Sequence, residues 1–124
     1  MAPCGHALDF KGIEASEGRV VFEFTPQEFH YNPIGSVHGG VITTLMDSAM
    51  GCAVHSTLPA GTRYTTLELK VNFIRGIGKN TGILQCIGTM IQGGGRVAVS
   101  EAKLVDAKGR LYAHGTSTCL ILRP

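Results

Sequence analysis

The chain has 124 residues, of which 44% are hydrophobic and 16% charged, and its formal net charge is +2. This length allows one domain, taken to span residues 1–124, with a modest core. The weak positive charge argues against a nucleic-acid partner, which needs a strongly basic surface. With so few charges, a small monomer would expose much apolar surface, so we expect contacts between copies of the chain.

The hydropathy pattern also excludes a membrane protein. No stretch reaches the roughly 18 uncharged apolar residues of a membrane span. Residues 1–6 lack a basic region followed by an apolar run, so we expect no signal peptide. The cysteines form no CxxC pair, which indicates free thiols in a reducing compartment and predicts a cytoplasmic protein. These cysteines are Cys4, Cys52, Cys86 and Cys119.

Residues 10–25 predict a β-hairpin with a turn at residues 16–18. Apolar residues alternate in the second strand, as is typical of a half-buried strand, and Pro26 ends it. The Asn-Pro and Gly-Ser pairs in residues 27–37 indicate a loop. A helix is expected over residues 38–56, because an apolar run follows that loop and Leu-Pro-Ala-Gly then ends it.

After the helix the hydrophobic period changes to two. Leu67, Leu69 and Val71 fall on one face of the first strand, and Thr66 falls on the other. Glycine-containing turns join the strands, so we expect an antiparallel meander. The only element available to cover its inner face is the helix. The sequence therefore predicts an α+β fold, a curved antiparallel sheet wrapped around one long central helix. The expected strands cover residues 64–75, 82–92, 96–106 and 110–122.

Asp47 is the most informative residue of the chain. It is the only Asp, Glu, Lys or Arg between Tyr31 and Arg63. On a helical wheel it lies opposite the apolar side that faces the sheet. That apolar side comprises Val41, Ile42, Leu45, Met46, Ala49 and Ala53. The residues around Asp47 are small or apolar rather than Lys, Glu or Gln, which suggests that a second subunit covers them. They are Gly40, Thr43, Thr44, Met50, Gly51 and Val54.

The start of the helix offers a second chemical feature. Gly39 and Gly40 leave N–H groups unobstructed at a helix N-terminus, where they can stabilise a developing oxyanion. Asp47 lies eight residues further on, about 12 Å along the helix axis at 1.5 Å per residue. One carbonyl group cannot contact both groups of the same helix. The spacing therefore predicts an active site shared by two subunits.

These residues resemble a known family. The run from Asn32 to Gly40, Asn-Pro-Ile-Gly-Ser-Val-His-Gly-Gly, followed by Leu45, Asp47 and Gly51, is similar to the hotdog-fold acyl-CoA thioesterases of the phenylacetate-degradation type. The similarity extends over about residues 8–122. It implies a dimer or a dimer of dimers, an acyl-CoA substrate, and neither a cofactor nor a metal.

The resemblance also implies roles for individual residues. Gly39 would polarise the thioester carbonyl, while Asn32 and His38 would orient it. Asp47 of the neighbouring subunit would be the general base or the nucleophile, and Thr66 would position the attacking water. Gly40 and Arg96 are the candidate substrate-binding residues; Lys103 and Arg75 are alternatives to Arg96 for the phosphates of coenzyme A.

Two other functions compete with hydrolysis. A hotdog module could bind acyl-CoA as a sensor without turnover, but a pure binder gains nothing from a buried, unpaired acid. A hydratase of the same fold would use a histidine in a different loop pattern. The Cys and His residues show no zinc spacing, so no metal site is predicted. The sequence leaves the acyl group open, from aromatic to long-chain.

Overall fold

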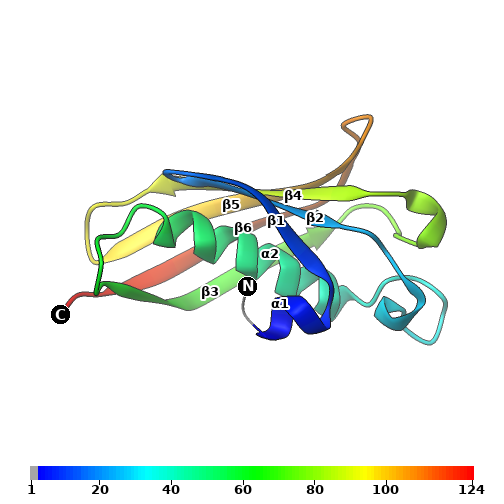
Figure 1. Ribbon diagram of the computed structural model, residues 1–124, viewed down its shortest axis with the longest axis horizontal. Coiled ribbons are helices and arrows are strands. Elements are labelled where there is room, and N and C mark those ends of the chain that lie inside the picture. Colours follow the sequence, from blue (N-terminus) through cyan, green and yellow to red (C-terminus); the bar gives the residue numbers. More distant parts are fainter. Residues whose placement is uncertain (1–2) are drawn as a thin grey trace.

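The computed structural model describes residues 3–124, with side chains described from Gly5 onward. Its sheet has six antiparallel strands in the order β1-β2-β4-β5-β6-β3, and the sheet wraps around α2 (Figure 1). The predicted α+β architecture is confirmed. The elements are α1 (Pro3–Ala7), β1 (Phe10–Ser16), β2 (Arg19–Phe24), η1 (Glu28–His30), α2 (Gly39–His55), β3 (Arg63–Phe73), η2 (Lys79–Thr81), β4 (Leu84–Gln92), β5 (Val97–Asp106) and β6 (Leu111–Leu122), where η marks a 3₁₀ turn.

The position of β3 differs from the expected meander. Strands β4, β5 and β6 follow one another as predicted, but β3 pairs antiparallel with β6 at the edge of the sheet. The connection over residues 74–83 is longer than a hairpin turn and allows β4 to begin on the other side of α2. Strand β3 then closes the second flank of the helix. Local periodicity contains no information about this order, because it depends on which strands must cover the helix.

A β-bulge in β3 also corrects the expected facing of Thr66. Thr66 pairs with Cys119 and Glu68 pairs with Thr118, so Leu67 has no pairing partner. The extra residue reverses the alternation of side chains. Thr66 and Val71 therefore both point toward α2, although strict alternation placed them on opposite faces. Leu67 is left 57% exposed at the sheet edge.

The apolar side of α2 forms the centre of the core. Five of the six residues expected to face the sheet are buried, and Val41 is half-buried. Met50, Gly51 and Val54 were expected on the uncovered side but are buried against this chain's own sheet. The sheet curls around more of the helix circumference than the helical-wheel prediction allowed, so it also covers these three residues. Tyr64 of β3 lies against Gly51, and Ser100 of β5 donates a hydrogen bond to the Met50 carbonyl at 3.2 Å.

Gly88 allows β4 to lie directly on α2. A Cβ atom at this position would stand 2.3 Å from the carbonyl oxygen of Ala49, a backbone atom that cannot rotate away. We expect Gly88→Ala to lower the free energy of unfolding by about 1–3 kcal/mol or more, as overpacking does. Urea denaturation measures this, with Gly95→Ala as the control, because nothing lies within 4 Å of that Cβ. Equal midpoints for the two variants would contradict the packing described.

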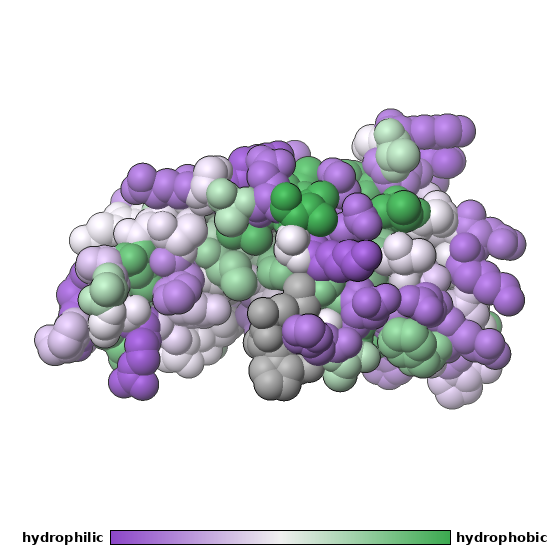
Figure 2. Space-filling view, viewed as in Figure 1, coloured by the Kyte–Doolittle hydropathy of each residue, from purple (hydrophilic) through white to green (hydrophobic). Residues whose placement is uncertain are grey.

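Large apolar side chains remain exposed at the β3 edge and beyond it. Leu67 and Phe73 are 57% and 55% exposed, and Ile74 is 51% exposed. Elsewhere, over β1 and β4, hydrophobic residues also reach the surface on the face drawn in Figure 2. Exposed apolar groups on an edge strand are typical of a surface that another chain covers. Among residues 3–124, no helix is long and apolar enough to cross a membrane.

Candidate active site

A buried histidine fixes the loop that leads into α2. His30 is only 1% exposed; its Nδ1 accepts a hydrogen bond from the Gln27 N–H at 2.9 Å, and its Nε2 bonds the Leu8 carbonyl at 2.7 Å. The His30 carbonyl in turn accepts from the His38 N–H at 2.7 Å. The loop over residues 27–38 is therefore anchored at both ends, which sets the direction in which the helix begins.

Asn32 lies within this anchored loop. Its side-chain Oδ1 accepts from the N–H groups of Ile34 and Ser36 at 3.1 and 3.2 Å, as in an Asx turn. Asn32 therefore stabilises the loop that the Asn-Pro pair indicates in the sequence. Within residues 5–124 its amide NH₂ has no hydrogen-bond acceptor, so that group can still donate to a ligand.

The two glycines at the helix start play different parts. The Gly40 N–H donates to Nδ1 of His38, the N-cap residue, at 2.8 Å. A Cβ on Gly40 would stand 2.9 Å from that nitrogen, so a larger residue here would displace the capping ring of His38. In the described part of the chain no group accepts from the Gly39 N–H. Gly39 is therefore the free donor at this helix terminus, while the exposed His38 keeps Nε2 available.

Asp47 lies on the side of α2 that the sheet leaves half-open. Its carboxylate Oδ1 accepts a hydrogen bond from the Thr66 hydroxyl at 3.1 Å. The bulge at Leu67 makes this contact possible, because it turns Thr66 toward the helix. Within residues 5–124 no Lys, Arg or His forms an ion pair with Asp47. The structure therefore brings together two of the residues predicted from sequence, and it leaves the acid without a cation.

Tyr64 is a neighbour of this pair that the sequence did not single out. It lies two residues before Thr66 on β3, and a Cβ on Gly51 would stand 2.6 Å from its hydroxyl. Burial, followed by the nearby Cys52, Asp47 and Cys119, raises the pKa of Tyr64 to about 12. Tyr64 therefore stays neutral. In the sequence, Tyr64 could have been found from its position two residues before Thr66, since alternate residues of a strand share a face. That inference requires knowing that Thr66 faces the helix.

The site residues do not all meet within one chain. Gly39 and Asp47 are separated by eight residues of continuous helix, about 12 Å. Arg96 lies at the β4–β5 turn, where its carbonyl accepts from the Ile121 N–H. Figure 1 shows that turn and the start of α2 at opposite ends of the molecule. The single chain thus places His38, Gly39 and Gly40 at one end, Asp47 and Thr66 in the middle, and Arg96 at the other.

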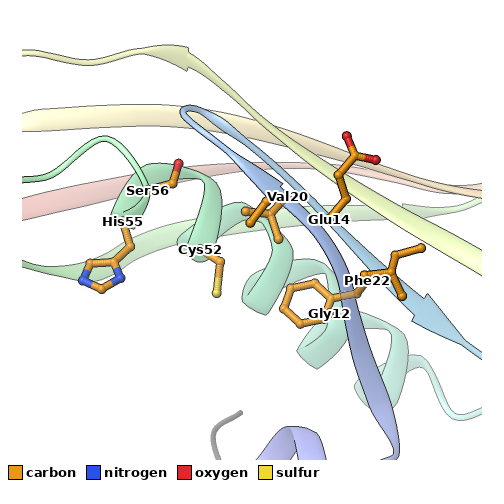
Figure 3. Close-up of a pocket in the computed structure, with 9 residues that line it drawn as sticks. Gly12, Glu14, Val20, Phe22, Cys52, His55 and Ser56 are labelled. Atoms are coloured by element: carbon orange, nitrogen blue, oxygen red, sulfur yellow. The ribbon is translucent and has the colours of Figure 1, made fainter.

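Two pockets flank these groups. The first, of about 250 Å³, lies at the start of α2; Gly39, Phe73 and Arg75 contribute to its wall. The second, of about 500 Å³, lies between the C-terminal half of α2 and the β1–β2 hairpin. In Figure 3 the thiol of Cys52 and the ring of Phe22 project into this second space. Its lining is mostly apolar, which suits a hydrocarbon or aromatic group.

The Cys52 thiol reports on the charge of Asp47. Burial, and then the negative charge of Asp47, raises the pKa of Cys52. Asp47→Asn removes that charge, so the pKa of the thiol should fall and more thiolate should be present at pH 8. We expect Cys52 to react several-fold faster with iodoacetamide in the variant, measured in a Cys4→Ser background; Cys86 and Cys119 are buried. An unchanged rate would contradict the effect of the Asp47 side chain on the Cys52 thiol.

The family follows from comparison with known proteins. The sequence model of the family described as "Thioesterase superfamily" matches residues 34–113, which include the helix with Asp47 and the strand with Thr66. The chain belongs to the thioesterase superfamily. This membership assigns the chain to the thioester hydrolases.

The similar proteins agree with this assignment. This thioesterase-superfamily chain is 33% identical over 116 residues to a Saccharolobus solfataricus protein named as a candidate esterase, covering 94% of this chain and 81% of that protein. It is 26% identical over 106 residues to human acyl-coenzyme A thioesterase 13, covering 86% and 75%. The E. coli PaaI protein from the phenylacetic acid degradation operon superposes with a TM-score of 0.87 at 22% identity, covering 96% and 83%, which shows the shared hotdog fold.

Proposed function

We propose that this thioesterase-superfamily member hydrolyses acyl-CoA thioesters in a homodimer, which could itself pair into a dimer of dimers. Asp47 of one subunit and the Gly39 N–H of the other act on the same thioester. The single-chain separation of about 12 Å supports this sharing, because one carbonyl cannot reach both groups of one helix. The exposed apolar residues of the β3 edge, Leu67 and Phe73, support the association of two copies.

The proposed chemistry requires few groups. The thioester carbonyl oxygen accepts from the Gly39 N–H, which stabilises the negative charge of the tetrahedral intermediate by roughly 3–4 kcal/mol. Asp47 removes a proton from water held with the help of Thr66, or attacks the carbonyl carbon itself. The carbon–sulfur bond then breaks and the thiolate leaves readily. If Asp47 itself has attacked, water then hydrolyses the resulting anhydride, which releases the acid and regenerates the carboxylate. Neither route needs a metal or cofactor. His38 and Asn32 orient the carbonyl and the sulfur, with Gly40 beside them.

One observation carries this proposal. Among the side chains of residues 5–124, the Asp47 carboxylate is held only by a neutral hydroxyl, that of Thr66, on a half-open helix face. A carboxylate that is neither fully solvated nor neutralised by a cation costs free energy, so its presence favours a chemical task. A module that only bound acyl-CoA would gain nothing from an acid at this point.

A thiol-release assay tests the proposed function. Wild-type protein is supplied with short-, medium- and long-chain acyl-CoA, phenylacetyl-CoA and the corresponding acyl-carrier-protein thioesters. We expect free thiol from acyl-CoA, with loss of the activity in Asp47→Asn. Tight acyl-CoA binding without release above background would overturn hydrolysis and favour the sensor function.

The pocket beside Cys52 is the proposed site of the acyl group. Gly12 of β1 lines this pocket, and the nearest atom to a Cβ there lies 3.7 Å away, in the ring of Phe22. We expect Gly12→Leu to fill the pocket and to lower kcat/KM for octanoyl-CoA by roughly 10- to 100-fold, because several buried methylenes lose their place. Acetyl-CoA should be hydrolysed nearly as well as by wild type. Equal losses for both substrates would contradict this location.

A further inference from the structure

We propose that the phosphates of coenzyme A bind at a basic edge formed by Arg75, Lys79, Lys108 and Arg110, with Arg75 nearest the thioester. This inference rests on the proposed function and extends it, because it names the part of the chain that selects CoA over other thioesters. The four cations come from the β3–β4 connection (residues 74–83) and the β5–β6 turn (residues 107–110).

Arg75 connects this edge to the helix start. It lines the pocket of about 250 Å³ that also contains Gly39, whose free N–H is the proposed oxyanion donor. The Phe73 ring lies against Gly39, 3.3 Å from the position of a Cβ, and lines the same pocket. Arg75 is exposed, so its guanidinium can reach a ligand that enters this pocket.

Hydrogen bonds continue from Arg75 to the β5–β6 turn. The Arg75 N–H donates to the Tyr112 carbonyl at 3.2 Å, and the Tyr112 hydroxyl donates to Asp106 at 3.1 Å. Asp106 also accepts from the Arg110 side chain at 3.1 Å and from the N–H groups of Lys108 and Arg110, each at 2.9 Å. Four donors thus satisfy the carboxylate of Asp106, the last residue of β5, and residues 74–83 and 107–110 contain no Asp or Glu. The edge therefore presents positive charge to solvent.

A pocket of about 450 Å³ lies between the same two segments. Asn80, Thr81, Lys108 and Arg110 help to line it. Residues 74–77 border the Gly39 pocket and residues 80–83 border this one, so a single connection forms part of both walls. Figure 1 shows η2, the β5–β6 turn and the start of α2 at the same end of the molecule, and Figure 2 shows hydrophilic residues gathered there.

The spacing fits the arm of coenzyme A. Phe73 pairs with Ala113, and Arg110 lies three residues before Ala113, about 10 Å along an extended chain. The pantetheine arm spans more than this between the thioester sulfur and the pyrophosphate. A thioester at Gly39 can therefore place its phosphates on the basic edge, where Arg can bind them bidentately.

Arg96 is the rival candidate and lies far from this edge within one chain. Its neighbour Gly95 bonds Arg123, which follows directly after the strand residue, Leu122, that pairs with Arg63. Phe73 lies ten positions after Arg63 along β3, about 33 Å. For Arg96 to meet the phosphates, it would have to come from the partner subunit. The two arginines therefore make a matched pair of variants.

The test compares acyl-CoA with acyl-pantetheine, which carries the same thioester and arm without the nucleotide phosphates. We expect Arg75→Ala to raise KM for acyl-CoA roughly 5- to 20-fold with kcat nearly unchanged, because a screened phosphate contact is lost equally from ground and transition states. Its kinetics with acyl-pantetheine should match wild type. Arg75→Lys should recover part of the loss, and Lys11→Ala, which removes an exposed cation of β1 outside this edge, should behave as wild type with both substrates.

Other outcomes are equally informative. Equal losses on both substrates in Arg75→Ala, or a selective loss in Arg96→Ala instead, would overturn the basic edge as the phosphate site while leaving hydrolysis intact. A wild-type protein that hydrolyses neither acyl-CoA nor acyl-pantetheine would overturn the proposed function itself. High salt screens a phosphate contact, so the KM values of wild type and Arg75→Ala for acyl-CoA should converge as the salt concentration rises. Convergence would support the contact.

Discussion

Asp47→Asn is expected to lower kcat for acyl-CoA hydrolysis about 10²- to 10⁴-fold, the range attributed to a positioned carboxylate base. The amide has the shape of the carboxylate and can still accept a hydrogen bond from Thr66, so the packing around α2 is retained. An amide cannot take a proton from water at neutral pH or serve as a nucleophile. The measurement is steady-state thiol release, with KM expected to stay within a few-fold of wild type.

Two variants accompany this prediction. Ser48→Ala changes the next residue on the same half-buried helix face and should leave kcat within about two-fold. Thr66→Val keeps the β-branched shape but removes the hydroxyl that holds Asp47, so an intermediate loss is expected. A fully active Asp47→Asn protein with native circular dichroism would rule out the carboxylate as base or nucleophile.

Gly39→Pro is expected to lower kcat about 10²- to 10³-fold, because it removes the backbone donor proposed for the oxyanion. The backbone at this position accommodates proline. Gly39 is the first residue of α2, where proline is well tolerated. His38 before it has φ −61° and ψ 132°, the extended conformation that a residue before proline adopts. The Gly39 N–H bonds no other group in the described chain, so the fold loses no hydrogen bond.

Gly39→Ala is the matched control for this variant. Alanine introduces the same Cβ beside the Phe73 ring, at 3.3 Å, but it keeps the N–H. The more than half-exposed Phe73 can shift to admit it. We expect Gly39→Ala to retain most of its activity, so the ratio of the two variants isolates the donor. Equal activities for the alanine and proline variants would contradict the oxyanion assignment.

The elements of the fold were predictable where a local pattern determines them. The helix was expected over residues 38–56 and is found at Gly39–His55, since its caps and apolar stripe are both local. The long strands follow from two-residue alternation in the same way. The pairing of β3 with β6 was not predictable, because it depends on which flank of the helix needs cover.

The site was predictable to a similar degree. Asp47 stood out because it is the only Asp, Glu, Lys or Arg between Tyr31 and Arg63. The structure places Thr66 in contact with Asp47, although the facing assumed for Thr66 was wrong, and the role of Thr66 in positioning water stays a prediction. The bulge at Leu67 cannot be recognised in the sequence, because apolar and polar residues alternate regularly on both sides of it. Tyr64 was missed for the same reason, because its nearness to Asp47 exists only once β3 lies against α2.

Complementation between two inactive subunits tests the shared site most directly. Gly39→Pro and Asp47→Asn chains are co-expressed with different tags, and mixed dimers are purified by both. In a shared site, one of the two sites combines the intact Gly39 of one chain with the intact Asp47 of the other. We predict about half of the wild-type activity per mixed dimer, from two nearly inactive parents. Mixed dimers no more active than either parent would show that each site lies within one chain and would contradict the account.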